Sequence, residues 1–321
     1  MTDAQQAPDM AALERMIAGA MRQALRPGLY VIATPIGNLA DLTLRAVVIL
    51  SRADRIYAED TRVSRRLLAA YGLVRPIRVY NDHSGEQVRD EIVGEIAEGG
   101  MVALVSDAGT PLISDPGYKL VRAVCDMGHQ VFAVPGPSAL TAMLSISGLP
   151  TDQVLFAGFL PSKASGLRRR LEALAAVPAT LVIYEAPQRI AQLIDIAHEV
   201  LGDRQAAIGR ELTKLHEAVV RGSLCELRDT LGGMPQKGEL VVAIAGPDPA
   251  ADAHDITDDV IVTALDRELA RAGLAQAAKA VSLALGVPKS RVFAIGRDLK
   301  RGSEVGPEGD RREADSDTGP E

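Results

Sequence analysis

The sequence predicts an α/β protein in which two α/β domains precede a small helical domain. Short apolar runs typical of strands alternate with stretches whose apolar side chains recur at helical spacing, from residue 28 to about residue 246. A small, acidic, proline-containing segment interrupts this alternation, and three further helical patterns follow it. Strands that alternate with helices imply right-handed crossovers and largely parallel sheets.

The first α/β domain is expected at residues 28–137, after an N-terminal extension at residues 1–27. Its strands are predicted at residues 29–33, 55–58, 77–80, 101–106 and 131–134. Helical spacing follows at residues 42–53, 62–70 and 117–127. Ser84 and Gln87 have the spacing of a capping box, which predicts that another helix begins there and ends at Gly99 and Gly100.

The second α/β domain is expected at residues 138–246, and short links between its later strands favour a mixed sheet. Its strands are predicted at residues 154–159, 179–185, 205–210, 217–223 and 239–245, and its helices at 165–176, 188–201 and 225–231. A linker is expected at 247–256, a helical domain at 257–300 with helices at 258–273, 275–285 and 289–299, and a disordered tail at 301–321.

Composition excludes several classes of protein. No apolar run reaches the roughly 18 residues that a membrane span needs, and the first 27 residues do not resemble a signal peptide. Two distant cysteines and five scattered histidines indicate neither disulfides nor a metal site, so a cytoplasmic protein is expected. The net charge is −7, and the tail contributes three arginines against seven acidic residues. Nucleic-acid binding would therefore need a local basic patch.

Three loops at predicted strand ends share the same residue types. They are residues 34–38 (TPIGN), 107–111 (DAGTP) and 135–139 (PGPSA). Ligands of parallel sheets bind where such loops gather, glycine permits close approach of the backbone, and proline fixes the loop. Each loop alone is more simply a tight turn, but three in one domain favour a binding site. Without a G-x-G-x-x-G or G-K-[ST] motif, they suit a nucleoside-like ligand with few phosphates.

Several longer motifs then identify a family. In order, the chain contains "LYVIATPIGNLADLTLRA", "AEDTR", "LVSDAGTPLISDPG", "VPGPSAL", "FAGFLP" and "RELTKLHE". Together they closely resemble the ribosomal RNA small subunit methyltransferase I family, of the tetrapyrrole methylase fold, over about residues 28–246. The resemblance implies two α/β domains with S-adenosylmethionine in the cleft between them. It also implies a homodimer that methylates the 2′-hydroxyl of a cytidine in small-subunit (16S) ribosomal RNA.

The resemblance assigns cofactor contacts to matching positions. Those in the first domain are Pro35, Asp107, Ala108, Gly109, Thr110, Pro111 and Ile113, with Ser138 and Ala139 from the next loop. Tyr184 and Glu185 would close the cleft from the second domain. The family's usual "ESPHR" is "EAPQR" here, so the chain has no histidine at that place, while Glu185 and Arg189 are present.

The acceptor hydroxyl needs a base or proton acceptor, because an alcohol is a poor nucleophile. The candidates are Glu59 and Asp60 in "AEDTR", Glu185, and Glu211 in "RELTK"; Lys214 could stabilise the alkoxide or hold a phosphate. Each has a simpler interpretation. Glu59 and Asp60 could favour a helix N-terminus, and Glu211 and Lys214 could form a surface ion pair. The sequence does not choose among them.

RNA contact requires cations, and four of them follow the "FLP" loop: Lys163, Arg168, Arg169 and Arg170. They could equally be a solvated helix face. Few aromatic residues are present, which favours recognition through phosphates, shape and the 2′-hydroxyl. The three C-terminal helices have the rhythm of a helix-turn-helix and carry positive charge, and they could bind RNA or pack a dimer.

Two other functions compete with RNA methylation. An enzyme of the same fold could methylate a tetrapyrrole, although such a substrate does not require the cations at residues 163–170 or the terminal helices. A regulator could bind the cofactor without turnover and hold DNA through those helices. Whether naked RNA or an assembled small subunit is the substrate stays open.

Overall fold

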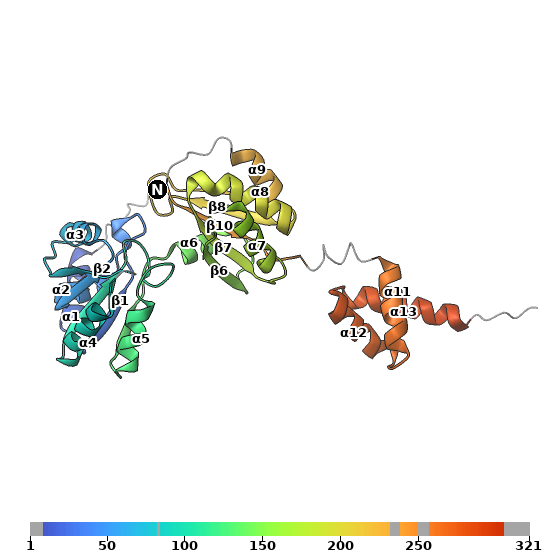
Figure 1. Ribbon diagram of the computed structural model, residues 1–321, viewed down its shortest axis with the longest axis horizontal. Coiled ribbons are helices and arrows are strands. Elements are labelled where there is room, and N and C mark those ends of the chain that lie inside the picture. The colour runs from blue at the N-terminus through green and yellow to red at the C-terminus, as the bar shows by residue number, and fades with distance from the viewer. Residues whose placement is uncertain (1–8, 82–83, 232–237, 249–256, 305–321) are drawn as a thin grey trace, which may run out of the picture. The chain divides into compact units, whose positions relative to one another are not determined.

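The structure, a computed structural model, describes residues 9–81, 84–231, 238–248 and 257–304. The chain divides into two compact units, Met1–Gly246 and Pro247–Glu321. Within the described residues of the first unit, ten strands form two five-stranded sheets (Figure 1). No described helix is long and apolar enough to cross a membrane.

The first sheet is parallel throughout and has the strand order β3-β2-β4-β1-β5. Its strands are β1 (Gly28–Ile32), β2 (Arg55–Ala58), β3 (Ile77–Val79), β4 (Met101–Val105) and β5 (Val131–Val134). All five strands therefore end at one edge, and the loops at residues 34–38, 107–111 and 135–139 gather there.

Helices cover both faces of this sheet. They are α2 (Leu44–Arg52) and α3 (Thr61–Ala70) on one face, and α4 (Glu86–Ala97) and α5 (Tyr118–Asp126) on the other. Side chains alternate along β1, so that Tyr30 and Ile32 pack against Ile49 of α2 while Leu29 faces Leu120 of α5. Burial on both faces explains why these strands are apolar throughout.

The second sheet is mixed, as the short links predict, with the order β6-β7-β10-β8-β9. Its strands are β6 (Val154–Phe159), β7 (Thr180–Glu185), β8 (Gln205–Arg210), β9 (Ala218–Ser223) and β10 (Leu240–Ile244). Only β6 and β7 pair in parallel, and the other pairs are antiparallel. β10, the last of these strands in the sequence, lies at the centre of the sheet.

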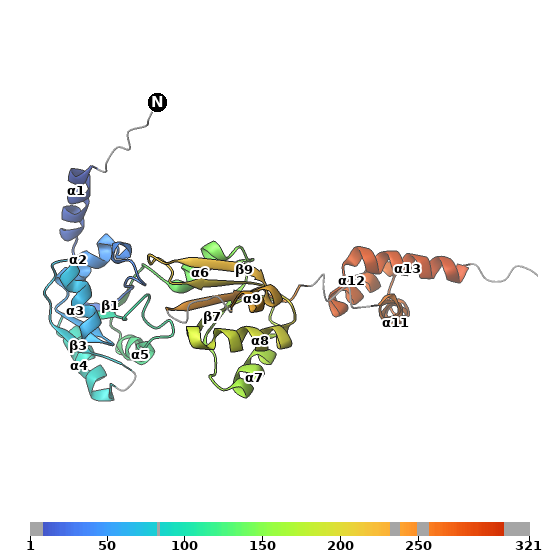
Figure 2. The ribbon, with the colours of Figure 1, turned by 90° about the horizontal axis from the view of Figure 1, so that it is seen from above.

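Figure 2 shows α6 (Ala139–Ser147) on one face of this sheet and α7 (Ala164–Leu174) and α8 (Ile190–Leu201) on the other. Met143 of α6 is fully buried against Val182 and Ala207 of the sheet, on the face that continues into the cleft. Two 3-10 turns, η1 (Leu39–Asp41) and η2 (Pro187–Arg189), and helix α9 (Leu224–Thr230) also belong to this unit.

The second unit contains α11 (Asp258–Leu269), α12 (Leu274–Leu285) and α13 (Lys289–Glu304). Ile261, Ala277 and Val292 form part of its own apolar core. Left-handed Gly286 (φ 66°) ends α12, so that α13 can begin after Pro288. α13 runs to Glu304, four residues into the segment predicted to be disordered, and residues 305–321 and most of the predicted linker lie outside the described residues.

Three local features differ from the sequence predictions. Helices α1 (Met10–Met21) and α6 were not predicted, since the first has no buried residue and the second follows a proline-rich loop. The capping box at Ser84 was wrong. Gly85 is the N-cap of α4, and the Ser84 hydroxyl instead accepts a hydrogen bond from the Asn81 amide at 2.9 Å.

A capping box does occur at α9, and it predicts a measurable stability effect. Ser223 Oγ accepts from the Glu226 amide at 3.3 Å, and the Glu226 carboxylate accepts from the Ser223 amide at 2.8 Å. Ser223→Ala should lower the free energy of unfolding by about 1 kcal/mol, measured by urea denaturation. Ser223→Asn keeps a capping oxygen and should lose less; equal losses would contradict this role.

Candidate cofactor cleft and active site

The three loops at the carboxyl edge of the first sheet are joined by hydrogen bonds. Thr34 and Gly109 exchange backbone hydrogen bonds of 2.8 and 3.0 Å, and the buried Thr34 hydroxyl donates to the Ser106 carbonyl at 3.1 Å. The Thr110 hydroxyl donates to the Pro137 carbonyl at 3.1 Å. The loops that share residue types in the sequence therefore form one connected rim.

The segment after β4 is unusually constrained. Leu112 (φ 73°) and Ser114 (φ 63°) take left-handed backbone conformations that side chains disfavour, and Gly109 (φ 80°) and Gly117 (φ 134°) do the same without a Cβ. A non-glycine residue in this conformation costs about 1–3 kcal/mol, and residues of this kind are concentrated at functional sites. This backbone curls around the cavity, with Asp107 at its beginning and Asp115 near its end.

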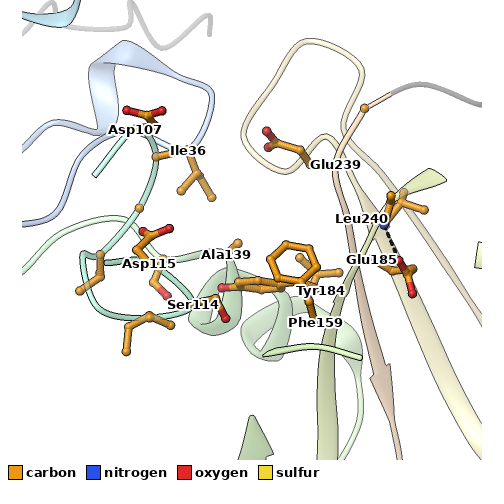
Figure 3. A pocket seen from close by; sticks show the side chains of 18 of the residues that line it. Ile36, Asp107, Ser114, Asp115, Ala139, Phe159, Tyr184, Glu185, Glu239 and Leu240 are labelled. Carbon is orange, nitrogen blue, oxygen red and sulfur yellow. Dashed lines mark hydrogen bonds between the residues drawn. The ribbon is translucent and has the colours of Figure 1, made fainter. Parts of the chain in front are cut away.

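A cavity of about 370 Å³ opens beside these loops, within the usual range for a small-molecule site. Figure 3 shows Ile36, Asp107 and Asp115 on one side and Tyr184, Phe159 and Glu239 on the other. The first group comes from loops of the parallel sheet, and the second from β6, β7 and the residue before β10. The site therefore needs both sheets of the first unit.

Nine of the eleven predicted cofactor residues line this cavity: Asp107, Ala108, Gly109, Thr110, Ile113, Ser138, Ala139, Tyr184 and Glu185. The other two, Pro35 and Pro111, are not among its lining residues; Pro111 is buried, and Ile36 stands where Pro35 was expected. Sequence reasoning missed the remaining lining residues, which are Ile36, Ser114, Asp115, Phe159, Ala186, Pro187, Gly238, Glu239, Leu240 and Val241.

The lining is acidic. Asp107, Asp115 and Glu239 contribute carboxylates, and none of the described lining residues is a lysine or arginine. Burial raises the pKa of Asp115 to about 6, with further contributions from the charges of Glu59 and Asp107, while a hydrogen bond with Ser106 opposes the rise. A pocket of this charge suits a cationic ligand and disfavours a polyphosphate.

Tyr184 forms the far wall. Its ring centroid lies 4.9 Å from that of Phe156 and 5.6 Å from that of Phe159, both edge-on. Burial raises the pKa of its hydroxyl, which hydrogen-bonds with Ser138 at the start of α6. The residue thus presents an aromatic surface to the cavity and joins the second sheet to the loop of the first.

Glu185 lines the cavity, but its carboxylate is buried against the Ala186 amide and the Arg189 guanidinium. The side chain is 1% exposed, accepts from the Ala186 amide at 2.8 Å and lies 3.3 Å from the Arg189 guanidinium. Arg189 also donates to the carbonyls of Leu160 and Pro161. These contacts fix the corner between β7 and η2, and burial raises the pKa of Glu185.

The four predicted catalytic residues lie in two separate groups. Asp60 caps α3 and accepts from Arg62 at 3.0 and 2.6 Å, and these hydrogen bonds lower its pKa to about 2. The backbone amide of Asp60 donates a hydrogen bond to the Asp107 carboxylate. Glu59 lies close enough to Asp115 for its charge to raise the pKa of Asp115. Asp60 therefore fits the helix-capping interpretation, because a carboxylate of such low pKa is a weak base.

The second group is in the "RELTK" loop. Lys214 Nζ lies 3.1 Å from Glu211 Oε1 and 3.3 Å from Glu239 Oε2, and the bond from Lys214 is the main cause of a lowered Glu211 pKa. Glu211 (φ 50°) and Thr213 (φ 66°) are left-handed, and a Cβ on Gly37 would overlap the Lys214 side chain. This loop therefore packs against the first loop of the parallel sheet.

The predicted RNA-contacting residues form what we call the α7 cation cluster: Lys163, Arg168, Arg169 and Arg170. All four are exposed, and Lys163 and Arg169 line a shallow hollow at the start of α7. Arg168 forms an ion pair with Glu199 of α8. The cluster begins four residues after Phe159, which belongs to the cleft.

The left-handed glycine of the rim offers a direct test of the cleft. A Cβ on Gly109 would lie 3.3 Å from Ile36 and would have to be accommodated at φ 80°. Gly109→Ala should weaken cofactor binding about tenfold, or about 1.4 kcal/mol, in titration calorimetry. Gly128→Ala is the matched control, because φ is 74° and no atom lies within 4 Å. Equal loss in both variants would contradict a role for this rim in binding.

Comparison with known proteins agrees with this architecture. Residues 28–228 match the family model described as Tetrapyrrole (Corrin/Porphyrin) Methylases. The crystal structure of diphthine synthase shares the fold, with a TM-score of 0.52 and 14% identity over 68% of this chain and 89% of that one. The two sheets and their connection are thus those of a tetrapyrrole-methylase-type protein.

Proteins of higher sequence identity show which family within this fold the chain belongs to. A Mesorhizobium japonicum protein named ribosomal RNA small subunit methyltransferase I is 47% identical over 257 residues, or 79% of this chain and 87% of the relative. A protein of the same name from Pseudomonas aeruginosa is 41% identical over 268 residues, or 83% and 95%. The chain belongs to the ribosomal RNA small subunit methyltransferase I family, and it is an S-adenosylmethionine-dependent methyltransferase.

The residues of the cleft fit this cofactor. S-adenosylmethionine combines a nucleoside, a positively charged sulfur and an amino-acid group. The acidic lining suits the positive charge, the apolar side chains of Ile36 and Tyr184 suit the nucleoside, and the small residues at 108–109 and 138–139 add little side-chain bulk to the lining. Gly109 leaves space that a Cβ would fill.

Proposed function

We propose that this chain transfers a methyl group from S-adenosylmethionine to the 2′-hydroxyl of a cytidine in small-subunit ribosomal RNA. The observation that carries the proposal is an acidic cleft with an exposed cation cluster close by in sequence, in a chain of this family. The acidic cleft suits a cationic methyl donor. The α7 cation cluster suits a phosphate backbone, which the cleft itself would repel.

In this proposal, the loop from Asp107 to Pro111, together with Ile113, holds the amino-acid portion and the sugar of the cofactor. Ser138, Ala139 and the loop of Pro35 form the neighbouring wall, and Tyr184 closes the opposite side. When bound, the cofactor supplies an electrophilic methyl group on a positively charged sulfur. The hydrogen bonds among the three loops keep the site in shape before the ligand arrives.

The chain's remaining task is to align the acceptor and to receive its proton. Methyl transfer is an in-line displacement, so much of the rate acceleration comes from holding donor and acceptor aligned and in contact against an apolar wall. Ile36, Phe159 and Tyr184 provide that wall. In this proposal Lys214, which forms ion pairs with Glu211 and Glu239, stabilises negative charge on the acceptor or its phosphate.

We propose that the chain acts in the cytoplasm as a homodimer, and that the assembled small subunit is a better substrate than naked RNA. We also propose that residues 28–137 and 138–246 act as the two halves of the active body, and that residues 257–300 form an appended helical domain for RNA docking or dimer packing.

The test is a transfer assay with labelled S-adenosylmethionine. Unmodified small ribosomal subunits, naked small-subunit RNA and a tetrapyrrole are offered in parallel. We expect label in RNA, with more in the assembled subunit than in naked RNA. Label on the tetrapyrrole alone would contradict the substrate, and cofactor binding without transfer to any of the three would favour a regulator.

A further inference from the structure

A second cavity lies beside the cofactor cleft. It measures about 200 Å³ and is lined by residues that follow β3, among them Asn81, Ser84 and Arg89, and by residues 115–119. Asp115 lines both cavities and is the one described residue that they share. Both β3 and β4 end at the carboxyl edge of the first sheet, so this cavity lies on the edge where ligands of such sheets bind.

The two cavities differ in charge. The cofactor cleft has no cation among its described lining residues, whereas Arg89 and Lys119 both line the smaller cavity. Arg89 is half-buried and makes a long hydrogen bond of 3.4 Å to the Ser84 carbonyl. Lys119 is exposed. Two cations at a cavity of this size suit one phosphate group.

The smaller cavity also presents groups that suit a nucleoside. Tyr118 is 66% exposed at its edge and offers an aromatic face for stacking, a mode that unpaired bases use. Asn81 and Ser84 supply polar groups at the same cavity. A volume of about 200 Å³ is below the roughly 300–1,000 Å³ of ligand pockets, so the cavity would hold no more than one nucleotide unit.

We propose that this smaller cavity receives the acceptor nucleotide of the RNA, and that Asp115, on the wall common to both cavities, accepts the proton of its ribose hydroxyl. This inference rests on the proposed function. The hydroxyl oxygen forms a bond to the methyl carbon while the bond between that carbon and sulfur breaks. The electron pair of the broken bond stays on sulfur. The O–H proton passes to the Asp115 carboxylate and is lost to water after product release.

Asp115 suits this role better than the other carboxylates of the site. Asp60 is held by Arg62, and Glu211 by Lys214, and both pKa values are lowered. The titratable and charged groups around Asp115 are the carboxylates of Glu59 and Asp107 and the hydroxyl of Tyr184, with Arg89 and Lys119 on the smaller cavity. A carboxyl with a pKa of about 6 is ionised at neutral pH and remains a stronger base than an ordinary aspartate.

The first test concerns Asp115. Asp115→Asn should lower the single-turnover rate, measured at saturating cofactor, at least about 100-fold, within the usual range for a general base. The wild-type rate should fall below about pH 6, because protonation removes the base. Asp115→Glu should restore part of the rate and keep an acid limb in its pH profile. A wild-type rate that is flat from pH 5 to 8 would overturn the role, whether or not the variants fold.

The second test concerns the cavity. Arg89→Gln combined with Lys119→Gln should raise KM for RNA about tenfold at pH 8, where Asp115 stays ionised, with a much smaller change in kcat and unchanged cofactor affinity. Arg65→Gln with Arg66→Gln is the matched control, because these exposed arginines of α3 line neither cavity. Equal KM changes in the two pairs would overturn the nucleotide site. If wild-type protein methylates RNA and both tests fail, the inference is wrong and the proposed function stands; if wild-type protein methylates no RNA, the proposed function is wrong.

Discussion

Thr110→Arg should abolish cofactor binding. Thr110 lines the cleft, and its hydroxyl donates to the Pro137 carbonyl, so the residue both faces the ligand and joins two loops. An arginine would fill part of a cavity of about 370 Å³ and would bring a positive charge to a site that suits a cation. We expect at least a 1,000-fold loss of affinity, or about 4 kcal/mol, in titration calorimetry.

Thr110→Ser is the matched control for this substitution. It keeps the hydroxyl that donates to Pro137 and removes only a methyl group, so its affinity should stay within about fivefold of wild type. Thermal unfolding of both variants separates a blocked site from an unfolded one. Unchanged affinity in a folded Thr110→Arg protein would contradict the position of the cofactor.

The second large effect is expected from the α7 cation cluster. Reversing Arg168, Arg169 and Arg170 to glutamate should weaken RNA binding by about 100-fold or more at physiological salt and leave cofactor affinity unchanged. Each lost phosphate contact should also reduce the salt dependence of binding by roughly one unit of slope. Filter binding at several salt concentrations measures both quantities.

The three arginines should contribute unequally to RNA binding. Arg168 is already paired with Glu199, whereas Arg169 lines the hollow at the start of α7. Reversing Arg169 and Arg170 alone should therefore give most of the loss. Reversing Arg65 and Arg66 of α3 is the matched control. It makes the same change in charge as reversing Arg169 and Arg170, at exposed positions outside the cluster. Loss of cofactor affinity alongside RNA affinity would indicate a folding defect.

The binding loops could be predicted from sequence because their physical cause is local. Apolar runs predict the strands, and a parallel sheet brings all strand ends to one edge, so glycine, proline and threonine after three strands predict a common site. The structure adds the hydrogen bonds between Thr34 and Gly109 and between Thr110 and Pro137. These depend on strand order, which the sequence alone did not supply.

The part of the far wall that precedes and begins β10 could not be predicted for the same reason. Glu239 precedes a strand that enters the middle of the second sheet, between β7 and β8, and nothing in its local sequence indicates this position. Tyr184 and Glu185 came from the family resemblance. The resemblance did not reveal that the Glu185 carboxylate is buried with Arg189.

Asp115 shows how a residue in a quoted motif can still be missed. The sequence Asp115-Pro116-Gly117 is an ordinary turn signal, and a turn needs no further explanation. Only the left-handed backbone at Leu112 and Ser114 brings this carboxyl back to the cavity that Asp107 also lines. Asp60 illustrates the reverse case, in which a suspected base caps a helix.

The central claim concerns the atom that receives the methyl group, and alkaline hydrolysis of labelled RNA tests it most directly. A methyl on a 2′-oxygen blocks the attack that cleaves the adjacent phosphodiester, so alkali leaves that linkage intact. After reaction of the wild-type protein with small-subunit RNA, we predict that label remains in an alkali-stable dinucleotide that yields 2′-O-methylcytidine on nuclease digestion. Label released in mononucleotides would place the methyl group on a base and contradict ribose methylation.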